Sequence, residues 1–269
     1  MHTNKVYPET VIRGMKMKKG TGQLFIQTGS LIAGFMVWVI ISSLMPFIKE
    51  DIHLTSTEIA WATAVPVILG SLLRVPIGYW TNKYGARILF SLCFIVLLIP
   101  IVIITYSSSL WMLIMGGLLL GIGGAVFSVG VTSLPKYYDK TKHGFINGIY
   151  GAGNIGTAIT SFLAPVLANL YGWRSTIKFY LILVLLFAIL NFIFGDKKER
   201  KINHSLSDQL KEVYKNPKLW VLSLFYFVTF GSFVAFTIYL PSFLVNQFEL
   251  DKVDAGIRTA GFITLATLF

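Results

Sequence analysis

Residues 87–106 read RILFSLCFIVLLIPIVIITY, and no charged side chain follows the first residue, Arg87. The hydrocarbon core of a bilayer is about 30 Å thick, so a helix needs roughly 20 mainly apolar residues to cross it. Seven stretches of the sequence meet this requirement. An eighth begins near Ala255, and we expect Phe269 to lie inside it. The pattern predicts an all-α, polytopic membrane protein. The other stretches of this kind are 23–47, 57–81, 110–134, 144–170, 176–195 and 218–246.

The composition excludes a soluble domain. Hydrophobic residues make up 55% of the chain and charged residues only 13%, whereas a soluble domain carries about 25% charged residues. The first apolar stretch, 23–47, is too long for the hydrophobic region of a signal peptide. The single cysteine, Cys93, can form neither an internal disulfide nor a cysteine-based metal site.

The basic residues are distributed unevenly between the predicted connectors. With a cytoplasmic amino terminus, seventeen Lys and Arg lie on the cytoplasmic side and five lie outside. Because the positive-inside rule requires this asymmetry, we expect this orientation in a multi-pass protein of the cell membrane. The net charge of +11 then belongs at a membrane surface and implies no nucleic-acid partner. The seventeen residues are Lys5, Arg13, Lys16, Lys18, Lys19, Lys83, Arg87, Lys136, Lys140, Lys142, Lys197, Lys198, Arg200, Lys201, Lys211, Lys215 and Lys218.

A polar, mixed-charge segment divides the chain. We predict a six-helix transmembrane bundle over 1–195, a cytoplasmic linker over 196–217, and the start of a second bundle over 218–269. Six spans, a linker and further spans are typical of a two-bundle transporter. Within the linker, Leu206, Leu210 and Val213 recur at helical spacing, which predicts an amphipathic helix at the membrane interface.

Arg74 is the basic residue that is predicted to lie within a span. Insertion scales give a cost of at least ~2.5–3.5 kcal/mol for a cation at the bilayer centre, and every Asp and Glu falls outside the predicted bilayer core. A guanidinium group that faces a cavity without a counter-ion suits a planar oxyanion, because its donors lie in one plane. The alternative is a structural arginine that reaches the interface or caps backbone carbonyls freed by Pro76. We favour the substrate-binding interpretation.

The predicted span 144–170 is rich in glycine and contains Asn154. Residues 151–156 read GAGNIG and match G-x-G-x-x-G, but no strand precedes them, so a dinucleotide site is rejected. We expect the glycines to allow close helix packing. The Asn154 amide either bonds between helices or donates to an anion in a cavity, and we favour the anion.

Three aromatic residues lie where a two-bundle protein lines its central cavity. They are Phe127, Tyr226 and Phe230. A tyrosine hydroxyl can donate to an oxyanion, and phenyl rings can hold a flat one. The alternative for each is ordinary helix packing or contact with lipid.

Four segments carry a resemblance to a known family. Residues 78–87, GYWTNKYGAR, resemble the loop motif of the major facilitator superfamily, with Asn82 where that motif usually has Asp. The segments LRVPIG, GNIG and YFVTFGSF, at 73–78, 153–156 and 226–233, resemble the nitrate/nitrite porters (NarK type) of that superfamily. The resemblance runs through nearly the whole chain.

The resemblance implies a major facilitator fold with a complete first bundle and a second bundle that is only begun. It implies nitrate uptake and nitrite export by alternating access, by a monomer with nitrate and nitrite as its partners. We expect this mechanism to need no metal and no organic cofactor. Arg74 would pair with the anion, and Asn154 and Tyr226 would donate hydrogen bonds to it. Phe230 and Phe127 would form aromatic walls.

The family site also contains a second arginine, in span eight. We therefore expect the reading frame to continue past Phe269 with an arginine. A facilitator for another small anion, such as a carboxylate or organophosphate, is the main alternative. A membrane enzyme lacks a candidate nucleophile or metal cluster here, and a sensor lacks an output domain. Since no carboxylate is predicted in the cavity, anion exchange is favoured over proton symport.

Overall fold

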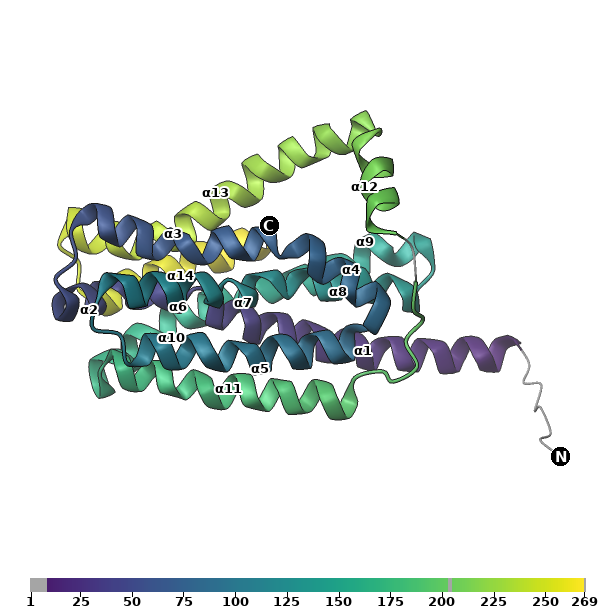
Figure 1. Cartoon of the computed structure of the whole chain (residues 1–269), viewed down its shortest axis with the longest axis horizontal. Helices are drawn as coiled ribbons and strands as arrows, with labels where there is room; N and C mark the ends of the chain where they lie inside the picture. The colour runs from purple at the N-terminus through teal and green to yellow at the C-terminus, as the bar shows by residue number, and fades with distance from the viewer. Residues whose placement is uncertain (1–8, 203–204, 269) are drawn as a thin grey trace.

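The computed structural model describes residues 9–202 and 205–268, and within them it contains helices and no strand. This confirms the predicted all-α class (Figure 1). The helices are α1 Glu9–Trp38, α2 Ile40–Ile52, α3 Ser56–Leu72, α4 Arg74–Tyr84, α5 Ala86–Thr105, α6 Leu110–Leu120, α7 Ile122–Ala125, α8 Phe127–Ser133, η1 Leu134–Tyr137, η2 Lys140–Lys142, α9 His143–Gly151, η3 Ala152–Asn154, α10 Ile155–Tyr171, α11 Trp173–Phe194, α12 Leu206–Tyr214, α13 Pro217–Phe248 and α14 Lys252–Leu268.

In the described residues, six helical segments are long and apolar enough to cross a membrane, and the bent pair α3–α4 makes a seventh. These seven segments coincide with the seven stretches predicted from hydropathy. The axes of α3 and α4 differ by 41°. Pro76 lies directly after this bend, and a proline removes the hydrogen bond to the carbonyl four residues earlier, which is that of Leu72. The bend follows from this loss.

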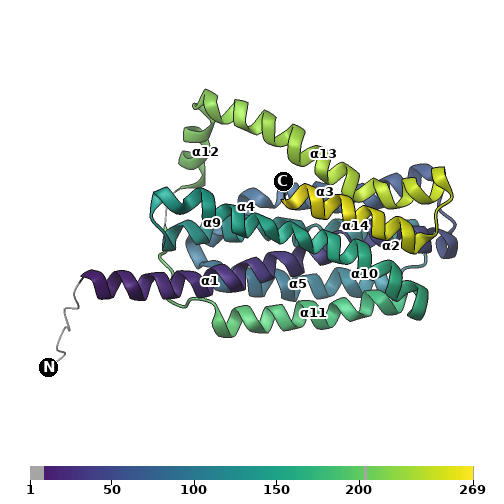
Figure 2. The same cartoon turned by 180° about the vertical axis from the view of Figure 1, so that it is seen from behind.

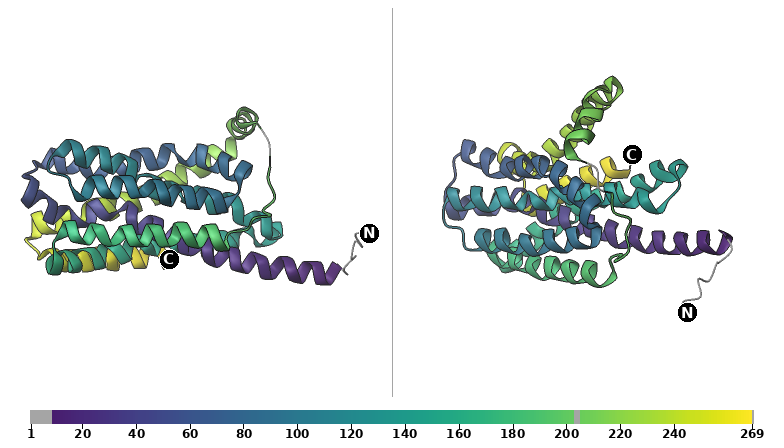
Figure 3. Two further views of the ribbon diagram at one scale, coloured as in Figure 1. Left: turned by 60° about the horizontal axis from the view of Figure 1, so that its bottom comes forward. Right: turned by 45° about the vertical axis from the view of Figure 1, so that its right-hand side comes forward.

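The helices pack side by side in an elongated bundle (Figures 1 and 2). We call the end at which α12 lies the linker end, and the end at which α2 meets α3 the opposite end. α13 diverges from the bundle at the linker end and converges with it at the opposite end, where it turns into α14 (Figure 3). The helices α1 to α11 form the first bundle, and α13 and α14 form the second part. Contacts between α10 and α14, and between α2 and α13, hold these two parts together.

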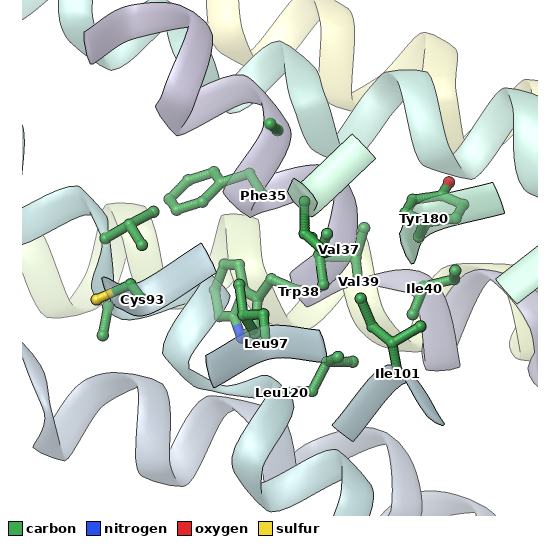
Figure 4. Close-up of a cluster of buried hydrophobic side chains, with 14 of the residues drawn as sticks. Phe35, Val37, Trp38, Val39, Ile40, Cys93, Leu97, Ile101, Leu120 and Tyr180 are labelled. Carbon is green, nitrogen blue, oxygen red and sulfur yellow. The ribbon is translucent and has the colours of Figure 1, made fainter. Parts of the chain in front are cut away.

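The core lies around the break between α1 and α2 at Val39. Phe35, Trp38 and Leu97 are almost entirely buried there and pack among aliphatic side chains (Figure 4). In the glycine-rich span, close packing is confirmed at Gly156, where an added Cβ would lie 2.2 Å from the carbonyl oxygen of Ile32 on α1. Small residues allow such close approach of membrane helices. The same prediction is wrong for Gly144, Gly148 and Gly151, where an added Cβ would have no described neighbouring atom within 4 Å.

The first part of the predicted linker packs against the first bundle. Glu199 accepts hydrogen bonds from Lys136 Nζ at 2.9 Å and from the Ala86 backbone N at 2.7 Å, and both side chains of this ion pair are buried. The backbone N of Ile202 donates to Asn82 O at 3.0 Å. Residues 196–202 are therefore attached to the α4–α5 turn and to η1.

The predicted amphipathic helix is present as α12, Leu206–Tyr214. Leu206 and Val213 line a small cavity of about 210 Å³ with residues of α4 and α8. The side chain of Leu210 lies outside the described residues, as do Lys5 and the side chains of Arg13, Lys16, Lys18 and Lys19. α12 thus contacts the linker end of the first bundle.

Candidate functional site

Arg74 is the first residue of α4 and lies at the bend between α3 and α4. Its Nη1 donates to the hydroxyl oxygen of Tyr226, on α13, across 3.3 Å. Its guanidinium carbon lies 5.2 Å from the ring centroid of Phe127 and 5.1 Å from that of Phe230. The structure therefore brings together four of the five predicted site residues, from α4, α8 and α13.

The charge of Arg74 is not neutralised by a carboxylate in the part of the chain that the structure describes. Its Nε is buried and has no hydrogen-bond partner. Burying a donor of a charged group without an acceptor costs free energy. The contacts of the guanidinium with the Phe127 and Phe230 rings offset only part of this cost. An anion that accepts from these donors would offset the remainder.

Arg74 and Tyr226 line a cavity of about 830 Å³ between the first bundle and α13. The lining extends along α13 from Leu219, near the linker end, to Tyr239. Its walls are mostly aliphatic and aromatic. Ligand pockets are commonly of this kind, with apolar walls and a few placed polar groups.

Asn154 lines a second cavity, of about 560 Å³, which it shares with residues of α13 and α14. Tyr226 and Phe230 line both cavities and form the wall between them; their rings stack with centroids 4.9 Å apart. The Asn154 amide donates to Gly151 O at 2.7 Å, and its Oδ1 is buried without a partner. Arg74 and Asn154 thus face the same aromatic wall from different cavities.

Phe127 contacts Arg74 from the first bundle and is not part of the lining of either cavity. It stacks on Phe35, with ring centroids 6.4 Å apart, and packs against Tyr150 at 5.8 Å. Tyr150 is fully buried and donates from its hydroxyl to Val126 O at 3.1 Å. This layer holds the Phe127 ring in place behind the guanidinium.

Trp38 and Ser71 line the Arg74 cavity and were not predicted to be site residues. The Trp38 indole nitrogen donates to Pro66 O at 3.3 Å. A sequence signal for Trp38 exists, because tryptophan in membrane proteins concentrates at the interfaces, whereas Trp38 lies inside a predicted span. Ser71 carries no comparable signal.

At the opposite end, polar contacts join α2 of the first bundle to α13 and α14. Lys252 at the start of α14 forms an ion pair with Glu50 on α2, and its Nζ lies 4.6 Å from the centroid of the Phe47 ring. Lys49 Nζ donates to Asn246 Oδ1 at 2.5 Å. Residues on both sides of the linker therefore meet at the end away from α12, while the Arg74 cavity extends toward the linker end.

A bent second span, a second helical part that meets the first at one end, and a cavity between them that Arg74 lines are features of the two-bundle transporter fold. The chain belongs to the Major Facilitator Superfamily, whose sequence profile matches residues 28–269. It is 62% identical over 246 residues to the "Nitrite extrusion protein" of Bacillus subtilis, covering 91% of this chain and 62% of that protein. It is 58% identical over 253 residues to the "Probable nitrate transporter NarT" of Staphylococcus epidermidis, covering 94% of this chain and 65% of that protein.

The chain thus spans less than two thirds of the length of these relatives. Their names describe transport and not enzyme activity. Among solved structures, the fold is similar to a bacterial homologue of the human lysosomal transporter Spinster. That match has a TM-score of 0.70 and 17% sequence identity, and it covers 93% of this chain and 60% of that one. The likeness concerns the fold alone.

Proposed function

We propose that the protein transports nitrate and nitrite across the cell membrane by alternating access, with Arg74 as the anion-binding cation. The observation that carries this proposal is the guanidinium of Arg74, which faces a cavity between two helical parts and is paired with no described carboxylate. The names of the relatives, a nitrite extrusion protein and a nitrate transporter, support this choice of anions.

The site offers a flat oxyanion both charge and shape. Phe127 and Phe230 lie near the Arg74 guanidinium at similar distances, 5.2 and 5.1 Å, so the plane of the group is restricted. A guanidinium donates in a planar fork, which matches the trigonal oxygens of nitrate. The Tyr226 hydroxyl, bonded to Nη1, can turn its own proton toward the same anion.

Asn154 has a supporting role in this proposal. Its amide nitrogen keeps one proton after donating to Gly151 O. Because Tyr226 and Phe230 separate its cavity from that of Arg74, the amide reaches the anion only when these side chains move. We therefore assign Asn154 to a later step of the transport cycle than Arg74.

We infer that the linker end faces the cytoplasm, as the basic residues of the connectors favour. The described conformation would then be open to the cytoplasm, since the Arg74 cavity extends to Leu219 and polar contacts join the parts at the opposite end. Rocking of one part against the other would break the Lys252–Glu50 pair and open the outer side.

The organisation proposed is a bundle over 1–195, a linker over 196–217 and the start of a second bundle over 218–269, acting as a monomer. Residues 196–202 would move with the first bundle, because Glu199 is bonded to Lys136 and to the backbone of Ala86. Residues 205–216 would then carry the flexibility of the linker. Exchange of nitrate for nitrite needs no carboxylate or histidine in the cavity, and the described lining contains neither.

The test is exchange by the full-length protein in proteoliposomes. Vesicles loaded with nitrite should take up isotopically labelled nitrate, and vesicles without internal anion should not. A proton gradient should have no effect on this exchange. Uptake of acetate or of an organophosphate without uptake of nitrate would overturn the proposal in favour of the other class of anion.

A further inference from the structure

The Arg74 cavity is far larger than the anion that it is proposed to bind. Its volume is about 830 Å³, within the range of about 300–1,000 Å³ in which proteins bind organic ligands of drug size. Nitrate is a single small trigonal ion. It would occupy only the part of the cavity at Arg74 and leave the rest to water.

The remaining wall is chemically different from the part at Arg74. It is formed by side chains with no charge, and most of them are aliphatic or aromatic. Apolar walls hold water poorly, so a ligand that replaces this water with its own apolar surface gains free energy. The wall comprises Trp38, Ala64, Val67, Ile68, Ser71, Leu219, Leu222, Ser223, Phe227, Phe230, Gly231, Val234, Ala235, Ile238 and Tyr239.

The polar groups of the lining are few, and apart from Arg74 they carry no charge: they belong to Trp38, Ser71, Ser223, Tyr226 and Tyr239. Among the described residues that line the cavity, Arg74 alone is charged, and its hydrogen-bond partner on α13 is the hydroxyl of Tyr226 at 3.3 Å. The apolar wall away from Arg74 favours a monoanion, because a second negative charge placed against that wall would be desolvated. The stacked rings of Tyr226 and Phe230 add aromatic surface close to the cation.

We propose that this cavity binds aromatic monoanions, such as aryl sulfonates or aryl carboxylates. The anionic group lies on Arg74, and the aryl ring packs between the α3 side of the wall, at Val67 and Ile68, and the α13 side, at Leu222. Such a ligand reaches the cavity from the linker end and competes with nitrate. The inference rests on the proposed function, since both place an anion on Arg74.

The probe is naphthalene-2-sulfonate, and methanesulfonate is its matched partner with the same head group and no ring. Calorimetric titration of the purified full-length protein should give at least tenfold tighter binding of the aryl sulfonate. Nitrate should displace it competitively. Equal affinity of the two sulfonates would overturn the inference. So would the absence of competition if both nitrate and the aryl sulfonate bind.

Two leucines on α13 provide a control for position. Leu222 lines the cavity and Leu224 does not, although both side chains are 60% exposed. In Leu222→Trp the bulkier ring fills the apolar part, so the ratio of aryl sulfonate affinity to nitrate affinity should fall at least fivefold. Leu224→Trp should leave this ratio unchanged. Ala64→Leu, on the facing wall, is the second variant that fills the same space.

Arg74→Gln separates the two proposals. Loss of both ligands is the expected result. Suppose that Arg74→Gln loses the aryl sulfonate affinity of the wild-type protein, and that the wild-type protein neither binds nor exchanges nitrate. The proposed function then fails and the inference stands. If nitrate binds through Arg74 and the aryl sulfonate does not, the inference fails and the proposed function stands. An aryl sulfonate affinity unchanged in Leu222→Trp, Ala64→Leu and Arg74→Gln would place the ligand elsewhere and overturn the inference.

Discussion

Arg74 on α4 donates a hydrogen bond to the hydroxyl of Tyr226 on α13 across 3.3 Å, although the two residues are 152 positions apart in the sequence. The bond connects the first bundle with the helix that follows the linker. It lies beside the Phe127 and Phe230 rings, which flank the same guanidinium. The relative position of the two parts and, in the proposed function, anion binding therefore depend on the same side chain.

Replacing Arg74 with lysine keeps the charge and removes the planar fork of donors. Hydrogen bonds to charged groups contribute about 1.5–3 kcal/mol each, so we expect nitrate affinity to fall roughly 10- to 100-fold. Equilibrium binding of nitrate to the purified protein measures this. Arg258→Lys is the control, because Arg258 is exposed and pairs with Asp254 on its own helix. Unchanged affinity in Arg74→Lys would show that Arg74 is a structural residue.

Tyr226→Phe removes the hydroxyl and keeps the ring that stacks on Phe230. We expect a loss of nitrate affinity of roughly 3- to 10-fold, which corresponds to one ordinary hydrogen bond. The double variant with Arg74→Lys should lose less than the sum of the two single effects, because the residues are in direct contact. Tyr171→Phe, at an exposed site, should change nothing. Strict additivity would contradict a shared site.

The ion pair between Lys252 and Glu50 can be tested by charge reversal. In Glu50→Lys the two cations repel, so the opposite end should open more often. A cysteine at Ala235, which lines the cavity, should then react faster with an impermeant thiol reagent from that side, on a Cys93→Ser background. Combining Glu50→Lys with Lys252→Glu should restore slow labelling. If labelling does not respond to either change, this pair is not part of a gate.

The orientation is tested by cysteines at Ser109 and Ser205, also on the Cys93→Ser background. Ser109 precedes α6 at the opposite end, and Ser205 precedes α12 at the linker end; both are exposed. In intact cells an impermeant thiol reagent should label the Ser109 variant and not the Ser205 variant. The reverse pattern would place the linker end outside and invert the proposed direction of opening.

Glu199→Gln tests how residues 196–202 are attached to the first bundle. The side chains of Lys136 and Glu199 are only 7% and 2% exposed, so neutralising Glu199 leaves a buried cation without its partner. Removal of one member of a buried pair costs about 3–5 kcal/mol, and we expect a clear fall in the thermal unfolding midpoint in detergent. Glu249→Gln, at an exposed helix end, is the control. Equal midpoints would mean that the pair contributes no stability.

Hydropathy alone determined much of the fold. A chain segment in hydrocarbon must satisfy its backbone hydrogen bonds internally, so long apolar runs become helices irrespective of their neighbours. For this reason the seven predicted stretches coincide with the observed segments. The helix α12 was predicted in the same way, from the helical spacing of Leu206, Leu210 and Val213. The importance of Arg74 was also evident, because a cation within an apolar span is unusual wherever the helix packs.

Only the tertiary structure decided what surrounds that cation. Helical periodicity does not specify which helices become neighbours, so neither the pairing of Arg74 with Tyr226 nor the separation of Asn154 into a second cavity follows from spacing. Trp38 entered the site through packing of α1 beside α3. Glu199, which composition assigned to a linker, became buried because its carboxylate accepts from Lys136 and from the start of α5. Contacts between distant segments depend on how whole helix surfaces fit together, and that information is not local in the sequence.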